Sequence, residues 1–404
     1  MRKACNWIIL LFFVSCTNST KQESSLDIIR VWDALQNTEK IKLSQFIKSI
    51  EYIHLEESDQ TSLTNPIIEV TDEFIITRNT GTFNPGPILI FDRKSGKFIR
   101  GVGKIGRGPG EYLVGNVTLY NIYNGTLYGL GDKNKIIEYD TKGEFLGSFK
   151  LPVMDDEKVS AQYLTQTITL DQYLDSNIFV AYISNSTGVD KRRIVLFKRD
   201  SVIKVFPNHQ FWKRKVWGGF SSFSGPSFFR LNGELSIKEV YNDTIFQITK
   251  TSLIPRFVIQ TEGHNPYPEL QDKKIDADFF KEIANYMLFS HLCENKNCIF
   301  FQLQFNNIYF YTGFFDKSSK KTTICNLQDP TKSAFIDDLN GFLPISPIGI
   351  TEANEMISIL EAQDIIRWIK ENPDKAKTIG GKMKWMKTYS ESSNPIVVIA
   401  KLKE

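Results

Sequence analysis

The chain has 404 residues, of which 41% are hydrophobic, and its 30 phenylalanines and 15 tyrosines make it rich in aromatic side chains. Aromatic residues favour strands, because they pack well on a pleated surface. The formal net charge of +3 is small and argues against a nucleic-acid partner.

The N-terminus carries a predicted export signal. Arg2 and Lys3 form a positive region, and residues 7–14 are an apolar run too short to cross a bilayer as a helix. The run ends in Ser15-Cys16, which resembles the cleavage site of bacterial lipoproteins. We therefore expect residues 1–15 to be removed and Cys16 to carry a lipid. A plain secretory signal with a coincidental cysteine is the alternative.

A lipid-anchored tether is predicted for residues 16–40, because the residues that directly follow Cys16 are polar. The mature protein is therefore expected in the cell envelope, anchored to the outer membrane by its lipid and without a transmembrane helix. The sequence leaves open which leaflet it faces.

Two segments of the chain repeat one pattern. In residues 88–99 and 136–146, apolar residues precede an aromatic–aspartate pair, a turn with lysine and glycine, and further apolar residues. The two pairs, Phe91-Asp92 and Tyr139-Asp140, lie 48 residues apart, which is the spacing of one propeller blade rather than of a helical array.

Strand patterns continue through the chain between turn signals such as Asn124-Gly125 and Asn232-Gly233, which suit hairpin turns with positive φ. The expected strands are 41–55, 67–70, 74–77, 88–99, 117–123, 126–130, 136–146, 178–184, 194–197, 228–231, 234–240, 244–248, 299–305, 308–312 and 395–402. The sequence thus predicts an all-β fold, a six-bladed β-propeller over residues 41–404, closed by pairing between terminal strands.

Two helical insertions are expected in this propeller, near residues 276–292 and 351–389. The first has apolar residues at helical spacing, including Phe279 and Ile283, and Thr351 is a candidate N-cap for the second.

The most distinctive run is the glycine-rich segment 103–112, which contains Arg107, Glu111 and Tyr112. The preceding GxGxxG at 101–106 lacks the helix that a dinucleotide site needs, so no cofactor is expected. One interpretation of the segment is an inter-blade turn in which Arg107 and Glu111 form an ion pair. The other is a ligand-binding loop at the channel mouth, with Arg107, Glu111 and Tyr112 facing the ligand.

Segment 103–112 resembles the glycine-rich connector between blades of NHL-type propellers. Together with the lipoprotein signal and the run 336–344, it makes residues 41–402 resemble a family of bacterial six-bladed β-propeller lipoproteins. This resemblance implies the architecture and the anchor, but no activity.

A second candidate binding loop contains Trp212, Lys213, Arg214 and Trp217. Exposed aromatic side chains of this kind stack on sugar rings, whereas propellers also pack aromatic residues between their blades. Both interpretations stay open.

Cys293 and Cys298 are close enough in sequence for a disulfide outside the cytoplasm, with Cys325 as a buried free thiol. A zinc site would need a fourth ligand at suitable spacing, so no metal is expected.

No catalytic motif stands out. The four histidines are widely separated, and neither a GxSxG elbow nor a P-loop is present. The leading hypothesis is a monomeric, non-catalytic envelope protein that binds a glycan, a peptide or an envelope partner. The alternative is a propeller-type hydrolase or lyase that uses carboxylates in the channel.

Overall fold

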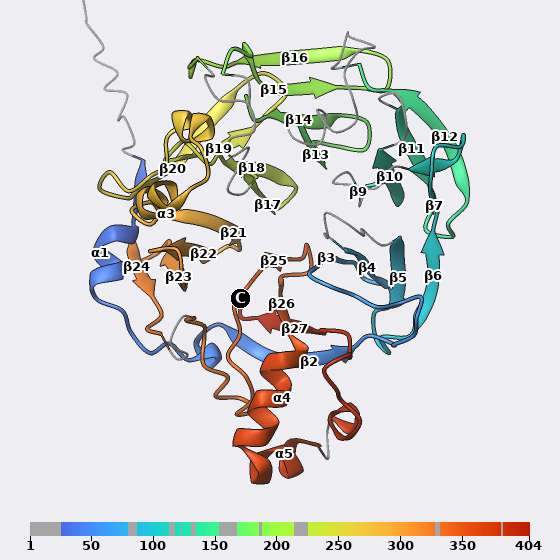
Figure 1. Ribbon diagram of the computed structural model, residues 1–404, viewed down its shortest axis with the longest axis vertical. Helices are drawn as coiled ribbons and strands as arrows, with labels where there is room; N and C mark the ends of the chain where they lie inside the picture. Colours follow the sequence, from blue (N-terminus) through green and yellow to red (C-terminus); the bar gives the residue numbers. More distant parts are fainter. Residues whose placement is uncertain are drawn as a thin grey trace, which may run out of the picture.

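The computed structural model describes residues 26–79, 87–112, 118–121, 123–130, 135–152, 168–185, 188–213, 225–327, 332–380 and 383–404. Six small antiparallel sheets stand in a ring around a central axis (Figure 1). The prediction of an all-β, six-bladed propeller is therefore confirmed.

The first three blades follow one another along the chain, each with its strands in sequence order from the inside of the ring outwards. Blade 1 contains β3 (Pro66–Val70), β4 (Phe74–Asn79), β5 (Ile88–Asp92) and β6 (Phe98–Val102). Blade 2 contains β9 (Thr118–Asn121), β10 (Thr126–Leu130), β11 (Lys135–Tyr139) and β12 (Phe145–Lys150). Blade 3 contains β13 (Ile168–Tyr173), β14 (Phe179–Ile183), β15 (Arg192–Phe197) and β16 (Val202–Pro207).

The other three blades include the strands near both ends of the chain. Blade 4 contains β17 (Ser227–Leu231), β18 (Glu234–Lys238), β19 (Thr244–Ile248) and β20 (Leu253–Gln260), with β1 (Asp27–Arg30) added in parallel to β20. Blade 5 contains β21 (Leu288–Glu294), β22 (Cys298–Phe305), β23 (Tyr309–Asp316) and β24 (Lys321–Ile324). Blade 6 contains β25 (Gly349–Ile350), β26 (Glu355–Leu360), β27 (Ile396–Leu402) and β2 (Ile47–His54).

The ring closes by pairing between strands from the two ends of the chain, as predicted. β2 is the outer strand of blade 6 and runs antiparallel to β27, with Tyr52 opposite Val398. Both strands carry buried apolar residues, and sharing a sheet removes the free edge that either would otherwise present.

The region predicted as a tether contains regular structure from residue 27 onwards. β1 extends blade 4, and α1 (Val31–Gln36) follows it directly. Ile29 and Val31 are almost fully buried, which explains why this part of the chain is held on the ring. The tether prediction rests on the polar residues next to Cys16, which precede this apolar segment.

The repeated aromatic–aspartate pattern forms the hairpin between the third and fourth strands of a blade. Phe91 and Tyr139 are buried, while the aspartates after them accept hydrogen bonds from the turn: Ser95 N to Asp92 at 2.7 Å and Glu144 N to Asp140 at 2.8 Å. The segment 88–99, expected as one outer strand, is therefore most of a hairpin, β5 and β6.

The hairpin turns at asparagine follow the expected chemistry in part. Asn232 and Gly233 both have positive φ, as a tight two-residue turn requires. At the predicted Asn124-Gly125 turn, Gly125 has positive φ but Asn124 does not, and both amides point to the carbonyl of Asn121. The sequence signal thus located this hairpin but not its turn type.

The helices are shorter than predicted. α3 (Ala277–Ile283) begins at Asp276, whose carboxylate caps it, but β21 replaces its expected second half because Phe289 and residues 292–294 are buried in a sheet. In the second insertion, β26 occupies the expected first turns. Helices α4 (Ala362–Glu371) and α5 (Pro373–Gly380) follow it outside the ring (Figure 1), with 3₁₀ turns η1 (Leu43–Gln45), η3 (Pro268–Asp272) and η4 (Lys384–Lys387) elsewhere.

Charged pairs join neighbouring blades at several junctions, alongside the apolar clusters packed between them. These pairs are Arg93–Glu355 between blades 1 and 6, Arg199–Glu138 between blades 2 and 3, Arg193–Glu239 between blades 3 and 4, and Arg256–Glu294 between blades 4 and 5. Because at least one partner of each pair is largely buried, these contacts set how the blades sit against one another.

Candidate functional site

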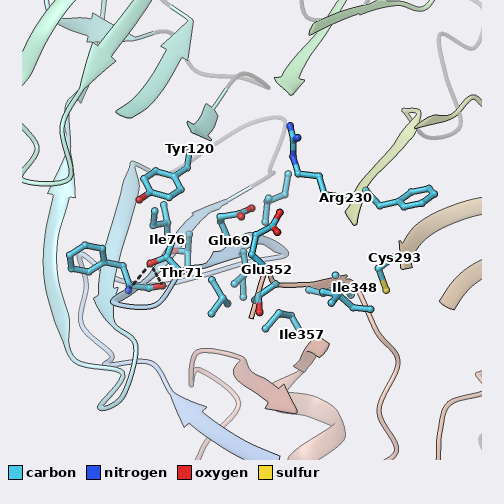
Figure 2. A pocket seen from close by; sticks show the side chains of 18 of the residues that line it. Glu69, Thr71, Ile76, Tyr120, Arg230, Cys293, Ile348, Glu352 and Ile357 are labelled. Carbon is cyan, nitrogen blue, oxygen red and sulfur yellow. Dashed lines mark hydrogen bonds between the residues drawn. The ribbon is translucent and has the colours of Figure 1, made fainter. Parts of the chain in front are cut away.

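A cavity of the described structure lies on the axis of the ring, where the innermost strands meet. Its volume is about 660 Å³, and every blade contributes to its wall. Figure 2 shows side chains from several blades around this space. We call it the channel pocket. Cavities of this size hold small molecules in other proteins.

The innermost strand of blade 1 supplies both apolar and charged groups to the channel pocket. In β3, Ile67 and Glu69 are exposed, whereas Pro66 and Val70 are buried. Successive side chains of a strand point to opposite faces, so Ile67 and Glu69 share the face that lines the pocket. Glu69, in the middle of the innermost strand of blade 1, thus lines the channel pocket.

Four carboxylates line the pocket from two neighbouring blades. Glu69, Asp72 and Glu73 belong to blade 1, and Glu352 belongs to the turn between β25 and β26 of blade 6. Within the described part of the chain, no hydrogen bond or ion pair reaches any of these carboxylates. We call this group the acidic wall.

The two turns that carry the acidic wall are fixed by one ion pair. Arg93 donates to the carboxylate of Glu355 at 2.8 and 2.9 Å, and also to the carbonyl oxygen of Thr71 at 3.0 Å. The hydroxyl of Thr71 accepts from Phe74 N at 2.9 Å and closes the turn on blade 1. Arg93 thus pairs with Glu355 and holds the two turns in place. It does not pair with a carboxylate of the acidic wall.

Arg230 of β17 reaches the pocket from blade 4, across the ring from blade 1 (Figures 1 and 2). Its guanidinium lies 4.3 Å from the ring centre of Tyr173 and donates to the carbonyl oxygens of Tyr173 and Gly233. A guanidinium has five N–H donors, so these contacts fix its position without exhausting it. Arg78, the other pocket arginine, sits opposite Ile67, away from the acidic turn of blade 1.

The Glu69 carboxyl is accessible to channel water but surrounded by protein. This enclosure raises the pKa of Glu69 to about 7, and the positive charge of Arg230 opposes the shift. The pKa of Tyr120, on blade 2, is raised by burial and by the charges of Glu69 and Glu73. Glu69 therefore changes charge near neutral pH.

A metal site would need the carboxylates of the acidic wall to be grouped with other possible ligands. Among the described residues, no group of three or more His, Cys, Asp or Glu side chains is placed to hold a metal ion. The volume of about 660 Å³ and the mixed polar and apolar lining suit an organic ligand.

The residues predicted in the glycine-rich connector lie away from the channel pocket. The connector forms a short parallel pair, β7 (Lys104–Ile105) and β8 (Glu111–Tyr112), at the outer side of the ring (Figure 1). Glu111 accepts a hydrogen bond from Gly108 N at 2.8 Å instead of pairing with Arg107, which is exposed. Tyr112 is buried between blades 1 and 2 and donates to the carbonyl of Val102.

The second predicted loop is described only in part. Trp212 is buried and its backbone amide donates to Gly188 O at 3.0 Å, while Lys213 is exposed. Arg214, Trp217 and the lipidation residue Cys16 lie outside the described residues.

The three cysteines in the described part of the chain are free. Cys293 and Cys298 are buried in one apolar cluster with Cys325, and burial raises the pKa of all three thiols. The predicted Cys293–Cys298 bond is absent because the β21–β22 register sets Cys293 opposite Phe300, so the two thiols are not directly opposed. They act as small apolar residues.

Comparison with known proteins assigns the chain to a family. The family described as "Domain of unknown function (DUF4934)" matches residues 26–401, which is nearly the whole described chain. The chain belongs to this family. No curated protein matches it.

Two solved structures resemble this DUF4934 protein in fold. One is a "putative exported protein" from Bacteroides fragilis, with 17% identity and a TM-score of 0.65, matched over 91% of this chain and 98% of that chain. The other is a DUF4221 family member from Bacteroides vulgatus, with 8% identity and a TM-score of 0.52, matched over 88% of this chain and 97% of that chain. At such low identities the likeness concerns the fold alone. The assignment to NHL-type repeats stays a prediction.

The residues of the channel pocket were not singled out from the sequence. Glu69 interrupts the apolar run Ile67-Ile68-Glu69-Val70, and that single acid was the available signal. Arg230 and Glu352 carried no such signal, because their neighbourhood depends on how the blades close into a ring.

Among the described residues, no helix has the length and apolar character to span a membrane.

Proposed function

We propose that this protein is an exported binding protein that holds a small organic ligand in its channel pocket. One observation carries the proposal: a cavity of about 660 Å³ to which all blades contribute, lined by carboxylates that form no hydrogen bond or ion pair with any described residue. Unpaired charges are costly in an enclosed site, so they favour a ligand that brings the missing partners.

The direct test is capture of a ligand from a mixture. Full-length protein in detergent is mixed with small molecules extracted from bacterial envelopes, and native mass spectrometry records what is retained. We expect the wild type to retain a compound that the double variant Glu69→Gln, Glu352→Gln binds at least about tenfold more weakly, the order of magnitude for losing one or two charged contacts.

The matched control is Glu51→Gln, which changes an exposed acid on the outer strand β2. It should bind as the wild type does. Absence of any retained compound, or equal retention by the double variant, would refute the proposal.

A hydrolase or lyase is the second candidate. The pKa of Glu69, near 7, suits a group that donates a proton at neutral pH. The same experiment separates the two functions: a binding protein releases the compound unchanged, whereas an enzyme releases a product of altered mass.

For the location, we propose that the mature chain is anchored to the outer membrane through a lipid on Cys16. The short apolar run before Ser15-Cys16 supports this location, and so does the description of a structural relative as a putative exported protein.

Cys16→Ala is expected to shift the protein from the membrane fraction to the soluble fraction on cell fractionation. Cys5→Ala, within the predicted signal, is the control that should leave it in membranes. Retention of Cys16→Ala in membranes would contradict the anchor.

A further inference from the structure

The channel pocket is electrically asymmetric across its width. The acidic wall contributes Glu69, Asp72, Glu73 and Glu352 on blades 1 and 6, which adjoin one another through the Arg93–Glu355 pair. Arg230 reaches the pocket from blade 4, and its positive charge acts on Glu69 (Figure 2). A ligand that spans the pocket therefore meets negative charge at one end and positive charge at the other.

The two poles are held in place by contacts that do not neutralise them. Arg93 fixes the turns of the acidic wall through Glu355 and Thr71, but its charge is spent on Glu355. Arg230 is fixed by carbonyl oxygens and by the face of Tyr173, and none of these carries a full negative charge. Arg230 and the acidic wall are thus fixed in position without a direct ion pair between them, so both can bind charged groups of a ligand.

Between the poles the pocket wall is amphipathic. Tyr120 and Phe228 line it from blades 2 and 4, and Ile67 is 47% exposed within it. Aromatic and aliphatic surfaces of this kind contact apolar side chains. The volume of about 660 Å³ exceeds what a single amino acid needs and suits a ligand of two or three residues.

From this arrangement we propose that the ligand is a short zwitterionic peptide, with its ammonium group at the acidic wall and its carboxylate at Arg230. This inference rests on the proposed function of the channel pocket. The ammonium supplies the direct ion pair that the four carboxylates lack, and the peptide carboxylate accepts hydrogen bonds from the remaining N–H donors of Arg230.

The charge of Glu69 makes such binding depend on pH. Arg230 faces Glu69 from blade 4, Tyr120 from blade 2, and Glu73 and Glu352 line the same pocket from the turns of blades 1 and 6. With a pKa of about 7, Glu69 gains its negative charge as the pH rises through neutrality. A peptide ammonium has a pKa of about 7.7–8.0 and is still mostly protonated at about pH 7.4, so attraction should increase between about pH 6 and pH 7.4.

The experiment compares chemically matched peptides on the full-length protein. The probes are an equimolar mixture of tripeptides, the same mixture acetylated at its N-termini, and the same mixture amidated at its C-termini. We expect the free tripeptides at saturation to raise the Tm by about 2 °C at about pH 7.4, with a smaller rise at about pH 6. Acetylation should abolish the rise and amidation should reduce it.

Variants connect the effect to the proposed poles. Glu69→Gln should remove the difference between about pH 6 and pH 7.4, while Glu51→Gln should keep it. No rise in Tm with free tripeptides, or an equal rise with acetylated ones, would overturn the inference. If envelope extracts yield a retained compound while tripeptides do not bind, the binding function survives and the peptide assignment fails.

Discussion

Replacing Glu294 by alanine is expected to lower the free energy of unfolding by about 3–5 kcal/mol, because it leaves two buried cations without their partner. The Glu294 side chain is fully buried between blades 4 and 5. Its oxygens accept from Arg256 at 2.7 and 2.8 Å and pair with Lys317 at 2.6 Å. Urea-induced unfolding of the wild type and the variant measures the difference.

A surface pair provides the matched control for this prediction. Glu39 pairs with Lys321 at 2.9 Å, but both side chains are more than half exposed, so Glu39→Ala should cost less than about 1 kcal/mol. Glu294→Gln keeps the volume and removes the charge, and it should fall between the two. Equal stability of Glu294→Ala and Glu39→Ala would show that the blades do not depend on this cluster.

Gly96→Ala is the second change with a large expected effect. Gly96 has a φ of +67°, and a Cβ atom there would lie 2.0 Å from the backbone oxygen of His54. The left-handed conformation alone costs about 1–2 kcal/mol for other residues, and relieving a clash with backbone adds a similar amount. We therefore expect a loss of about 3 kcal/mol, measured by the same urea titration.

The second copy of the repeat supplies the comparison. Gly143 occupies the corresponding turn of blade 2 with a φ of +84°, but its nearest obstacle, Gly101 O, is 3.3 Å away. Gly143→Ala should therefore cost about 1–2 kcal/mol, which is the conformational part alone. If both variants lose the same stability, the close approach of blade 1 to His54 is not a constraint.

The propeller could be predicted because its signals are local. Phe91-Asp92 and Tyr139-Asp140 each fit a hairpin on their own, since the aromatic residue enters the core and the aspartate bonds the turn a few residues later. The helix expected at 276–292 failed after Ile283, where pairing with β22 outweighed the helical spacing of Met287. Local periodicity yields to sheet pairing when the chain has a neighbouring strand to join.

The channel pocket could not be predicted, because its chemistry arises only when distant strands meet. Glu69, Arg230 and Glu352 belong to three different blades, and no short motif links them. The connector around Glu111 has an unusual density of glycines, and these glycines serve the turn, because the Glu111 carboxylate fills the space beside Gly106 and Gly108. The most distinctive sequence motif thus forms a structural turn, whereas the channel pocket is lined by residues that belong to no recognisable motif.

The attachment of β1 to blade 4 has a kinetic consequence for the ring. Between β1 and β2 the chain is bonded to blade 5, through Glu39 N to Ile324 O at 2.9 Å and Asn326 N to Glu39 O at 2.9 Å. If β2 separates from β27, it stays tethered a short distance away and at a high effective concentration. Re-pairing is then a short loop closure rather than a search by a free chain end, so the seam of the ring should reseal much faster than the ring unfolds.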